Sequence, residues 1–296
     1  MATDSPPTAG RGSAPPPTVA AWAERLSSLD IPVLGSTGDA LELLRADEDN
    51  VDAHGIAETV SNDPLMTLKV LVHAASHRGE RVVTHAETVT EALVMLGISP
   101  FFRAFQRQPT VEEWLHDEPA ALDGLQGTMH RAHRRANLAL AFAVQRMDPD
   151  AAIVHAVALM HEFADLLLWC HAPALQLQIA TMQCADPELR SKTAQEQVLH
   201  LDVCDLQVEL ARRWHLSPLL APSEGSRHVD EAKILTIQLA ARLARHIPRG
   251  WDSAAVGADI AELAGLLNVS VPNAERLSQE VWNEVGPDPK GISAMC

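Results

Sequence analysis

The residues with the clearest ligand chemistry lie in two neighbouring segments of the chain. His130 and His133 fall in the first, and His155, His161 and Glu162 in the second. Imidazole and carboxylate groups at the packed ends of two adjacent helices can bind a divalent metal ion, which then activates water at its open positions. The chain has 14 histidines, and buried structural histidines produce the same pattern. Spacing alone therefore favours structural histidines over a metal site.

Three arginines on the first of these segments, Arg131, Arg134 and Arg135, are predicted to form a cationic face. Guanidinium groups at helical spacing can hold a phosphate group or the carboxylates of a partner. The alternative is a solvated face that pairs with the acidic residues of segment 109–124, since most charge runs are solvated. Both interpretations remain open, with the solvated face preferred.

Helices must position these residues, because apolar residues after residue 19 recur at three- and four-residue spacing and alternating patterns are nearly absent. Asp63-Pro64 and Asp148-Pro149 have the chemistry of helix starts. The sequence thus predicts an all-α protein with five parts: a disordered tail (1–18), an N-terminal helical lobe (19–108), a linker (109–124), a second helical lobe (125–250) and a C-terminal helical extension (251–296).

Charge and composition argue against a nucleic-acid-binding protein, a thiolate zinc protein and a membrane protein. Lys and Arg number 23 against 39 Asp and Glu, and the net charge of −16 disfavours non-specific binding to nucleic acids and anionic membranes. The four cysteines form no CxxC pair, which argues against a thiolate zinc site. No basic start is followed by an apolar run and no unbroken apolar stretch suits a membrane span, so a cytoplasmic location is expected.

Several motifs together resemble the HDOD domain, a degenerate relative of the HD-type metal-dependent phosphohydrolases. The resemblance extends from about Ile31 to Ile247. Its motifs are Ile31-Pro32-Val33-Leu34, the segment 56–65, Leu93-Val94-Met95-Leu96-Gly97, His133, the segment 158–165 around His161-Glu162, and the segment 209–216. It implies a two-lobed helical fold whose second lobe, 125–250, is HD-like.

The resemblance also implies which residues descend from a metal site. His133 matches the first histidine of the catalytic relatives and His161 the second, but Glu162 replaces the aspartate of the His-Asp pair. Ala241 falls where a late aspartate ligand is expected, and Val203 where family members often have a histidine; a later histidine pair is reduced to His228. Because alanine and valine cannot ligate a metal, His133, His161 and Glu162 are predicted to be a vestigial set.

We therefore expect a non-catalytic regulatory protein of bacterial signal transduction, a pseudoenzyme without a cofactor. It would bind protein partners or a small phosphorylated ligand in the cleft between the lobes, bordered by His133, Arg134, His161 and Glu162. The alternative is a metal-dependent phosphohydrolase acting on a nucleotide or cyclic dinucleotide, in which Asp165 supports the ligands. A third interpretation, DNA binding by the C-terminal helices, is disfavoured because few cations are available there.

Overall fold

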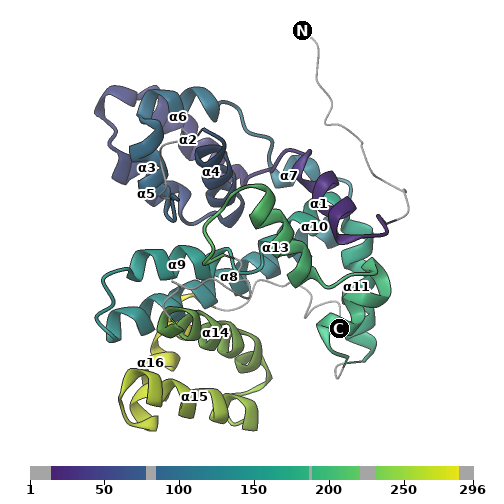
Figure 1. The fold of residues 1–296 in the computed structure, drawn as a ribbon, viewed down its shortest axis with the longest axis vertical. Helices are drawn as coiled ribbons and strands as arrows, with labels where there is room; N and C mark the ends of the chain where they lie inside the picture. Colours follow the sequence, from purple (N-terminus) through teal and green to yellow (C-terminus); the bar gives the residue numbers. More distant parts are fainter. Residues whose placement is uncertain (1–14, 78–84, 187–188, 221–230, 287–296) are drawn as a thin grey trace.

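The computed structural model describes residues 15–77, 85–186, 189–220 and 231–286. Over these ranges the protein is all-α, as the sequence predicts, and contains no named β-strand. Figure 1 shows a first group of helices, α2 to α6, and a second, larger group built around the long helix α8. Most of the predicted tail, residues 1–14, lies outside the described part of the chain.

The first group is organised by the buried carboxylate of Asp63. This carboxylate accepts hydrogen bonds from the amides of Leu65 and Met66 at 2.9 and 3.0 Å and so caps α4, whose first residue is Pro64. It also accepts from the Leu34 amide at 2.8 Å, which holds the chain before α2 against the start of α4. The helices are α2 (Gly35–Ala46), η1 (Glu48–Asn50), α3 (Ala53–Val60), α4 (Pro64–Ser76), α5 (Val89–Leu96) and α6 (Ile98–Ala104).

The second group packs around α8, which contacts α9, α10, α11, α14 and α16. Its second helix, α9, begins at Ala151 rather than at the predicted start Asp148-Pro149, because the Asp148 carboxylate accepts from the Asp150 amide at 2.9 Å and so forms a turn. The helices are α8 (Pro119–Gln145), α9 (Ala151–Leu159), α10 (Phe163–His171), α11 (Pro173–Ala185), α12 (Ser191–Leu199), α13 (Val203–Arg213) and α14 (Glu231–His246).

Two segments differ from their predicted roles. Residues 109–124, predicted to be a linker, contain α7 (Val111–Trp114) and the beginning of α8, because Thr110 forms a capping box with Glu113 and Pro119 occupies the first turn of α8. Helix α1 (Val19–Ser27), predicted to lie in the first lobe, packs against α13 of the second.

The C-terminal extension is a helical pair that packs on the second lobe. After η2 (Ile247–Arg249), helix α15 (Ala254–Leu267) contacts α14, and helix α16 (Val271–Glu284) contacts α8. The buried carboxylate of Asp259 joins α15 to the preceding helix, because it accepts from His246 Nδ1 at 2.7 Å and pairs with Arg242 Nε at 3.1 Å.

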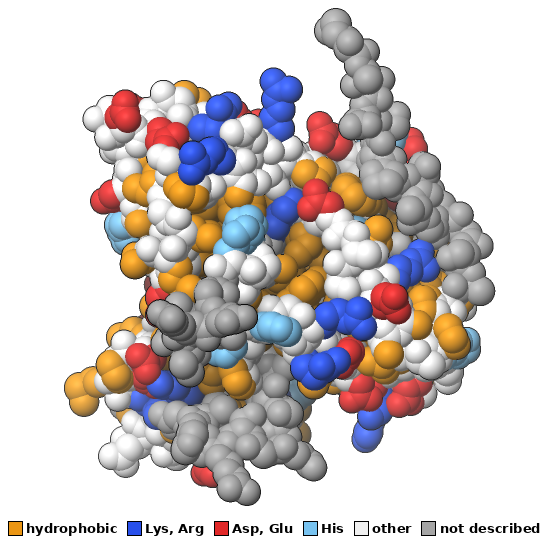
Figure 2. Space-filling model, turned by 45° about the horizontal axis from the view of Figure 1, so that its top comes forward, with side chains coloured by type: hydrophobic (Ala, Val, Ile, Leu, Met, Phe, Trp, Pro, Cys, Tyr) orange, Lys and Arg blue, Asp and Glu red, His pale blue; other side chains and the backbone are white. Residues whose placement is uncertain are grey.

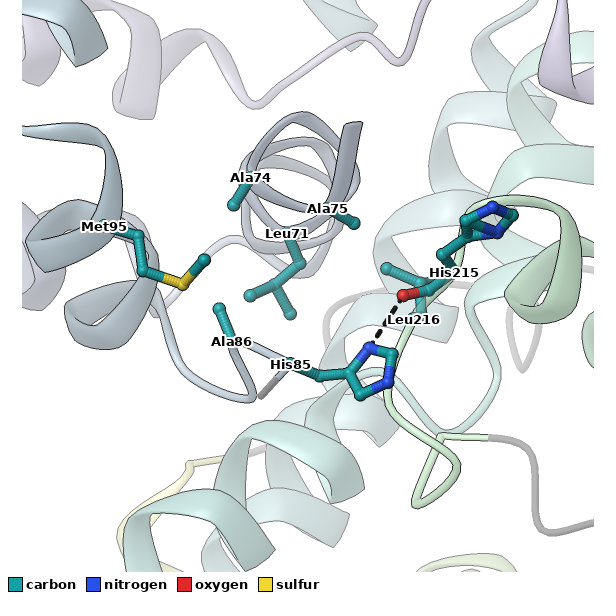
Figure 3. A pocket seen from close by; sticks show the side chains of 8 residues that line it. All are labelled: Leu71, Ala74, Ala75, His85, Ala86, Met95, His215 and Leu216. Carbon is teal, nitrogen blue, oxygen red and sulfur yellow. Dashed lines mark hydrogen bonds between the residues drawn. The ribbon is translucent and has the colours of Figure 1, made fainter. Parts of the chain in front are cut away.

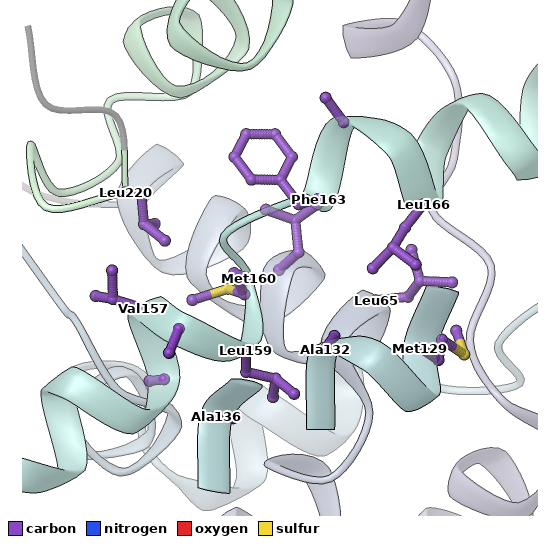
Figure 4. Packing of buried hydrophobic residues seen from close by; sticks show 14 of the residues in the cluster. Leu65, Met129, Ala132, Ala136, Val157, Leu159, Met160, Phe163, Leu166 and Leu220 are labelled. Atoms are coloured by element: carbon purple, nitrogen blue, oxygen red, sulfur yellow. The ribbon is translucent and has the colours of Figure 1, made fainter. Parts of the chain in front are cut away.

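One continuous core includes α8, α9 and α10. Met160 and Phe163, on either side of the turn between α9 and α10, pack with Leu159 and Leu166 above the small residue Ala132 of α8 (Figure 4). The apolar stretch Ala151–His171 has the length and hydropathy of a membrane span, but 61% of its most apolar window is buried inside the protein. Buried core helices commonly have this composition.

Candidate functional site

His161 and Glu162 lie in the turn that separates α9 from α10. Because the residues on both sides of this pair, Met160 and Phe163, are fully buried, hydrophobic packing fixes where the turn lies on α8. Glu162 occupies the N-cap position of α10, yet its side chain accepts no hydrogen bond from the amides of that helix. Its carboxylate is therefore available to other groups.

Two guanidinium groups engage this carboxylate. Arg135 Nη1, from α8, lies 2.8 Å from Glu162 Oε2, and Arg245 Nη2, from α14, lies 3.4 Å from Glu162 Oε1. Burial alone would raise the pKa of Glu162, but the positive charge of Arg135, with a smaller contribution from Arg131, outweighs it and holds the pKa well below the usual range. Glu162 is consequently a carboxylate whose charge is compensated by arginine.

His161 is a neutral imidazole in this environment. Burial, then the positive charge of Arg135, lowers its pKa to about 4. Its Nδ1 is buried and has no hydrogen-bond partner, while its backbone carbonyl accepts from Gln207 Nε2 at 2.7 Å. The ring nitrogen is therefore one free donor or acceptor atom beside a cationic group.

Asp165 lies in the first turn of α10 and is held by amide side chains rather than by cations. Its Oδ1 accepts from Gln176 Nε2 at 3.2 Å and from Gln195 Nε2 at 3.4 Å. Burial, followed by the negative charge of Glu162, raises its pKa to about 6. Asp165, the predicted supporting carboxylate, is thus a titratable group that accepts hydrogen bonds from side chains of α11 and α12.

His133 forms a histidine cluster with His130 on α8 and His155 on α9. Burial, then the charges of His155 and His130, lowers the pKa of His133, and burial lowers the pKa of His155. Within the described ranges, no three His, Cys, Asp or Glu residues are gathered so that they could hold a metal ion. The predicted set of His133, His161 and Glu162 is therefore not assembled as a metal centre.

A divalent metal ion does not fit the residues around Glu162. The carboxylate is already paired with Arg135 and Arg245, and a guanidinium charge about 4 Å from a dication would repel it by several kcal/mol at the effective dielectric constant of a protein. Ala241 and Val203, where further ligands would stand, are buried apolar side chains on α14 and α13. His228 lies outside the described residues.

The three predicted arginines do not form one exposed face. Arg134 and Arg135 are 5% and 2% exposed, and Arg134 faces α16, where its Nη2 donates to the Gly286 carbonyl at 2.7 Å. Arg131 is half-buried and donates to Thr128 Oγ1 at 3.0 Å. Adjacent positions on a helix point about 100° apart, so Arg134 and Arg135 pack into different interfaces.

A small pocket lies elsewhere, between the two groups of helices. Leu71, Ala74, Ala75, Ala86 and Met95 line it from the first group and His215 and Leu216 from the second, as Figure 3 shows. His85 Nδ1 and the His215 carbonyl approach to 3.0 Å at its edge. Sequence reasoning missed this pocket, because apolar residues that line a surface hollow have the same helical spacing as core residues.

The described residues form a helical domain with two groups of helices. The chain belongs to the HDOD family, since the HDOD domain model matches residues 36–228. Membership supports a regulatory or HD-related role.

Solved structures share this fold. The crystal structure of the MmoQ response regulator from Methylococcus capsulatus aligns with a TM-score of 0.58 and 16% identity, over 84% of this chain and 98% of that one. A virulence factor from Campylobacter jejuni aligns with a TM-score of 0.57 and 15% identity, over 90% of this chain and 98% of that one. No curated protein matches the chain.

Proposed function

We propose that this chain is a non-catalytic regulatory domain of bacterial signal transduction that acts by binding a partner protein. The observation that carries the non-catalytic part is the ion pair between Glu162 and Arg135, 2.8 Å apart. A carboxylate that neutralises a buried guanidinium group is not free to ligate a catalytic metal ion. The neutral His161 beside it supplies a single ring nitrogen, fewer than the three protein ligands of a catalytic zinc site.

The surface of α5 and the adjoining pocket support binding of a protein. Val94 and Met95 on α5 are 74% and 42% exposed, and Met95 also lines the pocket between the two groups of helices. Figure 2 shows hydrophobic side chains in the hollow at the centre of one face, with histidines beside them. Exposed apolar side chains next to a hollow are typical of surfaces that receive a partner's side chain.

The size of the pocket argues against a nucleotide as its ligand. The hollow encloses a volume of about 10 Å³, about the space of a single water molecule, whereas sites for drug-sized ligands measure roughly 300–1,000 Å³. The arginines that could bind phosphate at the predicted cleft, Arg134 and Arg135, already have partners within the protein. A hollow of this size encloses neither, so contact with an apolar side chain of a partner protein would be made over its mouth and the exposed surface of α5.

Affinity capture from the native cell tests the binding proposal. The full chain and a Met95→Glu variant serve as baits, with Met147→Glu as the matched control because Met147 is 88% exposed at the end of α8, away from the pocket. A protein captured by the full chain and by Met147→Glu, but lost with Met95→Glu, supports the proposal. Equal capture by all three baits places the contact elsewhere.

A hydrolysis assay tests the rival function. Purified protein is incubated with Mn²⁺ or Mg²⁺ and a generic phosphodiester, and turnover is compared between the full chain and His161→Ala. The regulatory proposal expects no turnover above the protein-free rate. Metal-dependent cleavage that disappears with His161→Ala would establish a phosphohydrolase instead.

A further inference from the structure

The carboxylate of Glu162 joins three elements of the second lobe through arginine. Arg135 reaches it from α8 at 2.8 Å, and Arg245 reaches its other oxygen from α14 at 3.4 Å. The Arg135 side chain is 2% exposed and the Glu162 side chain 24%, whereas Arg245 is 62% exposed. The inner pair is therefore shielded from solvent and salt, and the outer contact is not.

Arg135 also stabilises the end of α9. Its Nε donates to the carbonyl of Ala158 at 2.7 Å, and this carbonyl belongs to the last turn of a helix that ends at Leu159. The positive charge thus lies at the C-terminal end of α9, while the negative charge of Glu162 lies at the N-terminal end of α10. Both charges complement the helix dipoles, so one ion pair stabilises both sides of the turn.

Helix α14 supplies an outer cation where the catalytic relatives would supply a ligand. Ala241 has no donor atom, and Arg245 lies one turn further along the same helix and reaches Glu162. A dication on this carboxylate would face two guanidinium groups and one buried imidazole nitrogen. The residues around Glu162 thus provide positive charge and too few ligands for a dication.

We propose that Arg135 and Arg245 form a cation lock on Glu162 that takes the structural place of a divalent metal ion and joins α8, the α9–α10 turn and α14. The lock makes the centre of the second lobe independent of metal. This inference rests on the non-catalytic part of the proposed function, but it concerns stability and metal content, which the capture and hydrolysis assays do not measure.

Metal content and thermal unfolding of the full chain test the lock. The protein is dialysed with EDTA, offered Mn²⁺, Mg²⁺ or Zn²⁺ in turn, and analysed for bound metal and for Tm. The lock expects no stoichiometric metal and the same Tm with EDTA and with each ion. About one equivalent of bound metal together with a fall in Tm on chelation would overturn it, whether or not the protein hydrolyses a phosphodiester.

A double-mutant cycle tests whether the two residues act as a unit. Glu162→Gln and Arg135→Met should each lower Tm, because each leaves a poorly compensated charge, and the double variant should fall no further than the lower single variant. Strictly additive losses would overturn the lock. Arg276→Met is the control, since Arg276 pairs with Glu280 on its own helix, α16, away from Glu162. If Arg135→Met does not fold, a second cycle uses Glu162→Gln and Arg245→Ala, because Arg245 is the exposed partner of Glu162. Here too the double variant should lose no more Tm than the lower of the two single variants.

Discussion

The guanidinium group of Arg134 stacks over the indole ring of Trp282, with its carbon 3.8 Å from the ring centroid. The same guanidinium donates to the Gly286 carbonyl just beyond α16. A cation stacked on an aromatic ring and shielded from water contributes more than an exposed one. Arg134 therefore attaches the end of the C-terminal extension to the central helix α8.

Removing this side chain should loosen α16 while leaving the first group of helices intact. Arg134→Ala loses the stacking contact and the hydrogen bond, and it should cost about 2–4 kcal/mol of local stability. Hydrogen exchange followed by mass spectrometry measures the effect as faster exchange over Val271–Glu284. Arg276→Ala, which removes an exposed arginine paired with Glu280 on the same helix, should change exchange little. Equal effects of the two variants would contradict this account.

Gly124 of α8 allows close packing of Trp169 from α10. A Cβ atom at this glycine would lie 2.3 Å from Cη2 of the indole ring, and the ring cannot easily withdraw because its Nε1 donates to Thr128 Oγ1 at 3.1 Å. Gly124→Ala should therefore destabilise the protein by about 2–3 kcal/mol, as overpacking does. Chemical denaturation of the full chain measures this loss.

Gly127 provides the matched control on the same helix. A Cβ atom there meets only Arg131 Nη1, at 3.9 Å, so Gly127→Ala should stabilise the helix by up to about 1 kcal/mol through backbone entropy alone. The two substitutions are chemically identical and should have opposite signs. A stabilising Gly124→Ala would show that α10 can move away from α8.

Local chemistry made the helices predictable, including the start of α4. Asp63-Pro64 has the side chain and the fixed backbone angle that a helix start requires, and Asp63 caps α4 in the structure. The other oxygen of Asp63 accepts from the Leu34 amide, 29 residues earlier. No local pattern encodes that contact, because it depends on how the helices pack.

The sequence predicts which residues form the candidate site, but it does not predict which side chains they contact. The motif around His161-Glu162 locates the turn, but whether Glu162 meets a metal ion or a cation depends on Arg135 and on Arg245, 83 residues further along the chain. Adjacent arginines suggest a shared surface, yet the helical rotation directs Arg134 to Trp282 and Arg135 to Glu162. Both side chains are buried, and only tertiary packing determines which partner each of them meets.

The part-buried carboxyl group of Asp165 should make stability depend on pH between about 4 and 6. Its pKa is raised from 3.8 to about 6 in the folded protein, so the folded state keeps a proton that the unfolded state loses first. Stability is fully present below the unfolded pKa and falls as the pH rises towards 6. At neutral pH the charged carboxylate lowers the free energy of unfolding by up to about 3 kcal/mol, because each unit of difference between the folded and unfolded pKa is worth about 1.4 kcal/mol.

Asp165→Asn should remove that dependence, because a neutral amide can still accept from Gln176 and Gln195. The variant should unfold at a higher urea concentration than the parent at pH 7 and at nearly the same concentration at pH 3.5. Urea denaturation at several pH values measures the difference, with Asp123→Asn on the exposed side of α8 as the control. If Asp165→Asn shifted the midpoint equally at both pH values, the change would reflect packing, and the charged carboxylate would not be the source of the cost.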